Sequence, residues 1–159
     1  MKRETLFLKV VIFIMSLPIL ALCILGIPWF AKDMLETYTR LSAVIYSLLI
    51  ILYVSAIPYH YALFQTFKLL SYIDNNEAFS TLSVMSLKKI KYSAIIICVL
   101  YIAALPLIYL LADASDAPGM ILMGMGISFA SFVVCVFAAV LEKLLKNAIE
   151  LKSEIDLTV

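Results

Sequence analysis

The sequence predicts an all-α, polytopic membrane protein with four transmembrane helices and with both termini in the cytoplasm. Hydrophobic residues make up 65% of the 159 residues, charged residues only 14%, and the mean hydropathy is +1.09. A soluble domain of this size needs about 25% charged residues to cover its surface. Most apolar residues lie in four long runs, and most charges lie between the runs. Lipid rather than water must therefore surround this chain.

The four runs define the expected spans. A helix that crosses a hydrocarbon core about 30 Å thick needs about 20 mostly apolar residues. Backbone groups cannot stay unpaired in lipid, and transmembrane strands would alternate apolar and polar residues, so these runs are expected to be helices. The spans are residues 6–30, 41–67, 93–112 and 120–141 of one membrane domain that covers residues 1–159.

The first run begins behind Lys2 and Arg3, which is typical of a secretory signal peptide. It is too long for one, however, and no small-residue cleavage site follows it, so we interpret it as a retained span. Lys9 is its only charge and lies near the inner end, where its ammonium can reach the membrane surface. A short polar loop, residues 31–40, is expected to follow.

The second run carries no Asp, Glu, Lys or Arg. We expect its helix to continue past Lys68 into the cytoplasm and to stop at the turn-forming residues 74–76. His60 is the only histidine of the chain. It lacks the partners that a metal site or an acid–base pair needs, and we interpret it as a packing residue rather than a proton sensor.

The third helix is expected to begin inside the cytoplasmic loop, residues 68–92. Ser80 is well placed as its N-cap, with Phe79 and Val84 as a hydrophobic staple. The helix then runs straight into the third span. Its lysines reach the inner headgroup level, where anionic lipid attracts each of them by about 1 kcal/mol. These lysines are Lys88, Lys89 and Lys91.

The fourth span and a cytoplasmic tail helix, residues 142–154, are expected to form one continuous helix. Small residues at 124, 126, 128, 130 and 131 would let another backbone approach closely. In the tail, apolar residues follow helical spacing, and Glu142 and Lys146 form an i,i+4 pair. The apolar stripe must be covered by neighbouring helices, the membrane surface or a partner. The negative end, residues 154–159, is expected to be non-helical.

Three prolines lie inside the spans, where each removes one backbone hydrogen bond. They are candidate hinges around a cavity, and the alternative is the ordinary enrichment of proline in membrane helices. They are Pro18, Pro58 and Pro106.

The basic residues set the orientation. Of the twelve, only Lys32 and Arg40 lie outside the two termini, their adjoining helix ends and the middle loop. The positive-inside rule then places both termini and the middle loop in the cytoplasm, together with extensions of helices 2, 3 and 4. The candidate docking or lipid-headgroup contacts on this side are Asp74, Phe79, Ser80, Lys88, Lys89, Lys91, Lys143 and Lys146.

Several short motifs along this cytoplasmic side are similar to those of a known family. They are Ile57-Pro58-Tyr59, Leu69-Leu70-x-x-Ile73-Asp74, Ala78-Phe79-Ser80, Leu87-Lys88-Lys89-Ile90-Lys91 and Asp156-Leu157-Thr158-Val159. In these motifs, their order and their spacing the chain resembles the YoaS-like family, small four-span bacterial membrane proteins of unknown function. Ile155 stands where that family has Asn. The resemblance implies no enzyme activity. Family members are often encoded beside a small helix-turn-helix regulator of the Cro/C1 type, which implies a regulatory partnership.

The spans lack the groups that catalysis in lipid requires, because their deep parts contain no Asp, Glu, Lys or Arg. Cys23, Cys98 and Cys135 all lie within spans and form no CxxC pair, so they are interpreted as small packing residues. No phosphate loop, Ser/His/Asp set or nucleic-acid-binding pattern occurs. We expect no catalytic residue, no metal, no cofactor and no direct contact with nucleic acid.

These observations predict a non-enzymatic, multi-pass protein of the bacterial cytoplasmic membrane. Its cytoplasmic face is expected to bind a small cytosolic regulator, or the protein senses the state of the membrane. The alternatives are a passive carrier or exporter subunit for an apolar compound, and a structural subunit of a larger membrane complex. The lipid bilayer is the one partner that the composition requires, and a homo-oligomer is compatible with the small residues of the fourth span.

Overall fold

The structure is a computed structural model that describes residues 2–158. All regular elements of this part of the chain are helical, which confirms the predicted all-α class. They are α1 (Lys2–Ala21), the π-helical segment η1 (Leu22–Gly26), α2 (Ile27–Thr37), the 3-10 turn η2 (Thr39–Leu41), α3 (Ser42–Asp74), α4 (Thr81–Ser115) and α5 (Gly119–Thr158).

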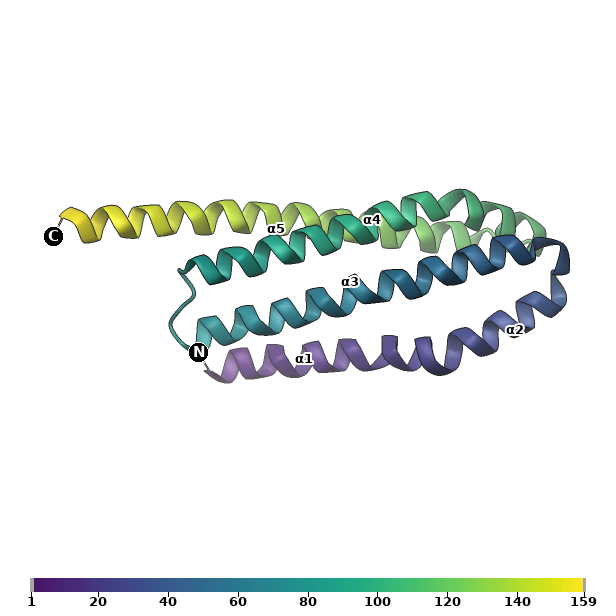
Figure 1. Cartoon of the computed structure of the whole chain (residues 1–159), viewed down its shortest axis with the longest axis horizontal. Coiled ribbons are helices and arrows are strands. Elements are labelled where there is room, and N and C mark those ends of the chain that lie inside the picture. The colour runs from purple at the N-terminus through teal and green to yellow at the C-terminus, as the bar shows by residue number, and fades with distance from the viewer. Residues whose placement is uncertain (1, 159) are drawn as a thin grey trace.

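The four expected spans are present. The chain has four helical stretches that are long and apolar enough to cross a membrane: 2–37, 39–74, 81–115 and 119–158. Both termini lie at one end of the molecule (Figure 1). We call this the cytoplasmic end, as the lysine distribution predicts, and the opposite end the outer end.

The spans form an open row rather than a closed ring. Helix α4 packs against α3 and α5, and α3 packs against α1 and α2 (Figure 1). No extensive contact joins α5 to α1, α2 or α3 within residues 2–158. The first span and α5 are therefore the two edges of the row, and each presents a free side to lipid.

Helices α3, α4 and α5 are longer than the membrane requires. They contain 33, 35 and 40 residues, which correspond to about 50–60 Å at 1.5 Å per residue, against a hydrocarbon core of about 30 Å. At the cytoplasmic end α5 extends past the ends of the other helices (Figure 1). Extensions of these three helices were predicted.

The turn between α3 and α4 lies where the sequence places it. Helix α3 ends at Asp74, and Asn76 adopts a left-handed conformation with φ 61°. Ser80 is the N-cap of α4, because its hydroxyl accepts a hydrogen bond of 3.4 Å from the amide of Ser83. The Ser83 hydroxyl is fully buried and donates to the carbonyl of Glu77. Of the loop expected at residues 68–92, only residues 75–80 lie outside a helix.

Two segments that we expected to be non-helical are helical. The prediction of a polar loop at residues 31–40 was wrong for most of this segment, because α2 continues to Thr37. Ala31 is buried and Met34 half-buried, so this turn of helix has its own packing face. The prediction of a non-helical end at residues 154–159 was also wrong, because the helix continues to Thr158. Residue 159 lies outside the described part. No Gly or Pro follows Gly126, and adding residues to a formed helix costs little.

Gly124 and Ser128 form the contact of α5 with α4 in the outer half of the membrane. Both are buried, and the Cys98 thiol of α4 donates to the carbonyl of Ser128 at 3.5 Å. A Cβ on Gly124 would lie 2.9 Å from Cδ1 of Ile108, whereas a Cβ on Gly126 would meet nothing within 4 Å. The small residues thus divide between a helix contact and a free surface.

Candidate functional site

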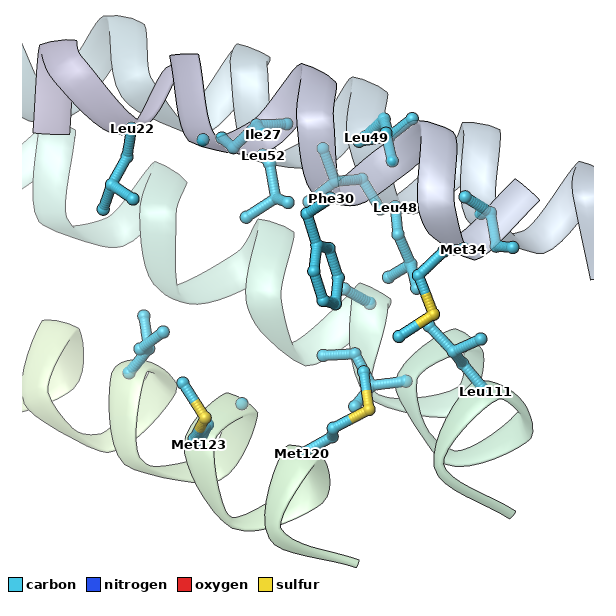
Figure 2. Close-up of a pocket in the computed structure, with 18 of the residues that line it drawn as sticks. Leu22, Ile27, Phe30, Met34, Leu48, Leu49, Leu52, Leu111, Met120 and Met123 are labelled. Atoms are coloured by element: carbon cyan, nitrogen blue, oxygen red, sulfur yellow. The ribbon is translucent and has the colours of Figure 1, made fainter. Parts of the chain in front are cut away.

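An apolar pocket of about 530 Å³ lies in the outer half of the row, between α2, α3, α4 and α5. Figure 2 shows Phe30 and Met34 of α2, and Met120 and Met123 of α5, reaching toward the space between the helices. No charged side chain lines this pocket. Its volume falls within the range of about 300–1,000 Å³ that is typical of small-molecule sites.

The pocket exists because α2 and α5 approach the same space without packing against each other. Lipid does not force two apolar helices together, since acyl chains are as apolar as leucine. Ala104, buried in α4, forms part of the pocket wall between α3 and α5. Because α2 and α5 belong to the two edges of the row, the side between them is expected to face the bilayer.

A π-helical segment forms the inner end of the pocket wall. In η1 the amide of Ile27 donates to the carbonyl of Leu22, five residues back. Pro28 has no N–H to continue this pattern, so the carbonyl of Cys23 needs another donor. The hydroxyl of Tyr53 in α3 supplies it at 2.9 Å. Single π turns occur frequently at functional sites.

This segment was not predicted, although the pair Gly26 and Pro28 is a signal for it. The prolines proposed as hinges, Pro18, Pro58 and Pro106, lie inside continuous α-helices, and their hinge role stays a prediction.

Asp74 ties the N-terminal helix to the end of α3. Lys9 pairs with its carboxylate at 2.9 Å, and the Thr5 hydroxyl donates to the other carboxylate oxygen. The Lys9 ammonium also lies 5.2 Å from the centre of the Phe67 ring. The hydrogen bonds from Thr5 and then from Lys9 lower the pKa of Asp74 below its ordinary value. Asp74, a candidate docking residue, thus has partners within the chain.

Glu142 joins α5 to α4 just beyond the fourth span. Its carboxylate accepts a hydrogen bond of 2.9 Å from Lys91, and Lys146 pairs with it at 3.2 Å. The second of these is the predicted i,i+4 pair. Burial by itself raises the pKa of Glu142, but the hydrogen bonds from both lysines outweigh it, so the pKa is lowered. The hydrogen bond to Glu142 raises the pKa of Lys91.

The remaining candidate residues are not brought together into one site. Lys88, Lys143 and Phe79 are exposed, whereas Ser80 is occupied as the cap of α4. Lys89 is half-buried and lines a shallow groove between α3 and α4.

His60 has a packing environment. Its Nδ1 lies 2.8 Å from the carbonyl of Ala56, and its ring lies edge-on against Tyr59. Its Nε2 is buried and has no hydrogen-bond partner within the described part of the chain. Across residues 2–158, no three His, Cys, Asp or Glu side chains come close enough to hold a metal ion.

Known proteins include a family that matches this chain and a relative that is similar to it over nearly its full length. Residues 29–159 match the family described as "Protein of unknown function (DUF2975)". The chain is 52% identical over 158 residues to the "Uncharacterized membrane protein YoaS" of Bacillus subtilis (strain 168), and the match covers 99% of each chain. No solved structure matches this chain.

Proposed function

The chain belongs to the DUF2975 family, whose function is unknown, and we propose that this member binds an acyl chain of the outer leaflet in the pocket between α2 and α5, without being an enzyme. The resemblance drawn from its motifs is confirmed by the 52% identity to YoaS. That identity to a membrane protein, with the four helical spans, makes it a multi-pass membrane protein. Sensing the state of the membrane is the role that such binding would serve.

The main observation behind the proposal is an apolar pocket of about 530 Å³ without a charged lining residue. It lies in the half of the row that the lysine distribution predicts to be in the outer leaflet. The gain on binding cannot come from leaving water, because an acyl chain is already in hydrocarbon. It comes from dispersion contacts, which the walls of an empty void forfeit. Such a site selects by shape and length rather than by charge.

The same lining supports neither ion-coupled transport nor catalysis. Both need ionisable or metal-bound groups at depth, and the pocket offers only apolar and aromatic side chains and two glycines. A passive carrier would need a path across the bilayer. The pocket lies against Ile45 to Leu52 of α3 and Met120 to Ile127 of α5, all within the outer half.

A tryptophan that fills the pocket should prevent acyl-chain binding. We expect a phospholipid with a photoreactive acyl tail, in lipid nanodiscs, to label α2 and α5 around Phe30 and Met123. Ile127→Trp should lower this labelling about tenfold, the ratio that corresponds to 1.4 kcal/mol. Labelled peptides are identified by mass spectrometry.

Val133→Trp is the matched control, because Val133 is exposed on the same helix but does not line the pocket. Both variants must keep the unfolding temperature of the parent chain. Equal labelling in Ile127→Trp and Val133→Trp would show that the tail contacts only the general lipid surface, and the proposal would fail.

A second candidate function is the docking of a small cytosolic regulator, the partner that the family resemblance implies. Phe79, Leu82 and Met85 are exposed at the cytoplasmic start of α4, with Lys88 one turn beyond. Large apolar side chains gathered on a polar end of a protein often mark an interaction site. The flanking lysine favours a partner with acidic residues around an apolar centre.

If the regulator docks at this patch, a charge introduced into the patch should weaken its binding. The full chain in detergent is mixed with a purified Cro/C1-type helix-turn-helix regulator, the partner that the resemblance implies, and the captured amount is measured. Met85→Asp should reduce capture about tenfold, through a charge placed in an apolar contact. Leu157→Asp, at an exposed tail position, should not. Equal capture by both variants, or none by the parent chain, would reject this site.

A further inference from the structure

A second apolar seam runs along the cytoplasmic half of α5. Leu141, Leu144, Ala148, Leu151 and Ile155 follow one another at alternating steps of three and four residues. These are the a and d positions of a coiled coil. The side chains that contact α4 stand in a different register, since Ala138 and Glu142 are the buried residues of this part of α5.

Four of the five seam residues are exposed, and Ala148 is half-buried. Leu144 is 59% exposed, Leu151 60% and Ile155 62%. Every residue from 151 to 158 is exposed, because α5 projects past the start of α4 (Figure 1). Water rather than lipid surrounds this projection, so each exposed apolar Å² costs about 25 cal/mol. A lone helix of this length is also marginal in water. Something outside this copy of the chain must cover the seam.

We propose that the seam pairs with the same seam of a second copy, so that two α5 helices form a parallel two-stranded coiled coil. Two copies inserted in one orientation bring their α5 helices together parallel and at equal depth. Each a or d residue then meets its own counterpart, as a two-fold interface requires. Because α5 is an edge of the row, this pairing needs no rearrangement of the other spans (Figure 1).

Two features favour a second copy over an unrelated helix. The seam continues without a break into the span, through Phe137 and Val134 at the same steps, where a cytosolic protein has no access. The positions that flank the seam in the tail hold Leu145, Asn147, Lys152 and Glu154. In a parallel pair Asn147 faces Lys152 across the interface, so no like charges oppose each other there.

Cysteine cross-linking of the full-length chain in native membranes tests the pairing. The three natural cysteines are first replaced by alanine, and single cysteines are then introduced at 144, 146, 151 and 153. Disulfide formation needs Cα atoms within about 7 Å. We therefore expect dimers from Leu144→Cys and Leu151→Cys, and about tenfold less from Lys146→Cys and Ser153→Cys, which lie on the opposite side of the helix.

Equal cross-linking at all four positions would indicate random collision and overturn the pairing, as would none in a correctly inserted chain. The molar mass in detergent gives a second readout. Leu151→Glu should convert a dimer into a monomer, whereas Leu157→Glu, exposed but outside the seam, should leave the dimer intact. A monomeric parent chain whose seam is covered by a regulator instead would also overturn the proposal. Neither readout depends on the outer pocket.

Discussion

Replacing Gly124 with leucine is expected to lower the free energy of unfolding by about 1–3 kcal/mol, the usual cost of overfilling a packed contact. Even a Cβ at this position would lie 2.9 Å from Cδ1 of Ile108 and 3.2 Å from Cδ2 of Leu105. These are ends of flexible side chains, so alanine should be tolerated better than leucine. Leucine requires α5 to move away from α4, which also weakens the contact of Ser128 with Cys98.

Gly126→Leu is the matched control, since a Cβ there meets nothing within 4 Å. Both variants lose a helix glycine and gain the same side chain on the same helix. Denaturing detergent titration of the purified chain measures the difference. If the two variants lose the same stability, the helix contact around Gly124 is not as described.

Removing the carboxylate of Glu142 is expected to cost about 2 kcal/mol of stability. In Glu142→Ala, Lys91 keeps its charge but loses the acceptor that lies 2.9 Å away. A hydrogen bond to a charged group contributes about 1.5–3 kcal/mol. The 3–5 kcal/mol of a fully buried ion pair does not apply, because Lys91 is 21% and Lys146 55% exposed.

The three-charge arrangement gives this prediction internal controls. Lys146→Ala should lose only about 0.3–0.5 kcal/mol, the usual value of an exposed i,i+4 pair. Glu150→Ala, at an exposed position of the same helix, should be close to neutral. A loss as large in Lys146→Ala as in Glu142→Ala would show that Lys91 is not the main partner.

The pH dependence follows from the direction of both pKa shifts. The folded pKa of Glu142 lies below its ordinary 4.5, so this group stabilises the fold above pH 4.5 and the contribution is lost as the pH falls through the lowered pKa. The folded pKa of Lys91 lies above its ordinary 10.5, so its contribution is complete below pH 10.5 and is lost as the pH rises through the raised pKa. Glu142→Ala should remove both changes from the stability curve.

Features that depend on nearby residues, or on the lipid alone, were predictable from the sequence. The apolar runs require helices because lipid leaves no other partner for the backbone. Local hydrogen bonding at residues 74–76 and at the Ser80 cap determines the turn between α3 and α4. Glu142 and Lys146 lie one helical turn apart, so their pairing also follows from the sequence. The helical end of the tail was not predicted, because its polar composition is typical of a loop, although no Gly or Pro there breaks the helix.

Contacts between distant residues were decided by the tertiary structure alone. Lys9 and Asp74 are 65 residues apart, and Lys91 and Glu142 are 51 apart. The same holds for Gly124 and Gly126, of which only the first meets another helix, and for the outer pocket. In a soluble protein, polar residues would distinguish the outward face of each helix. Here lipid and protein interior are equally apolar, so the pattern of side chains does not reveal which face meets a neighbour and which meets the bilayer.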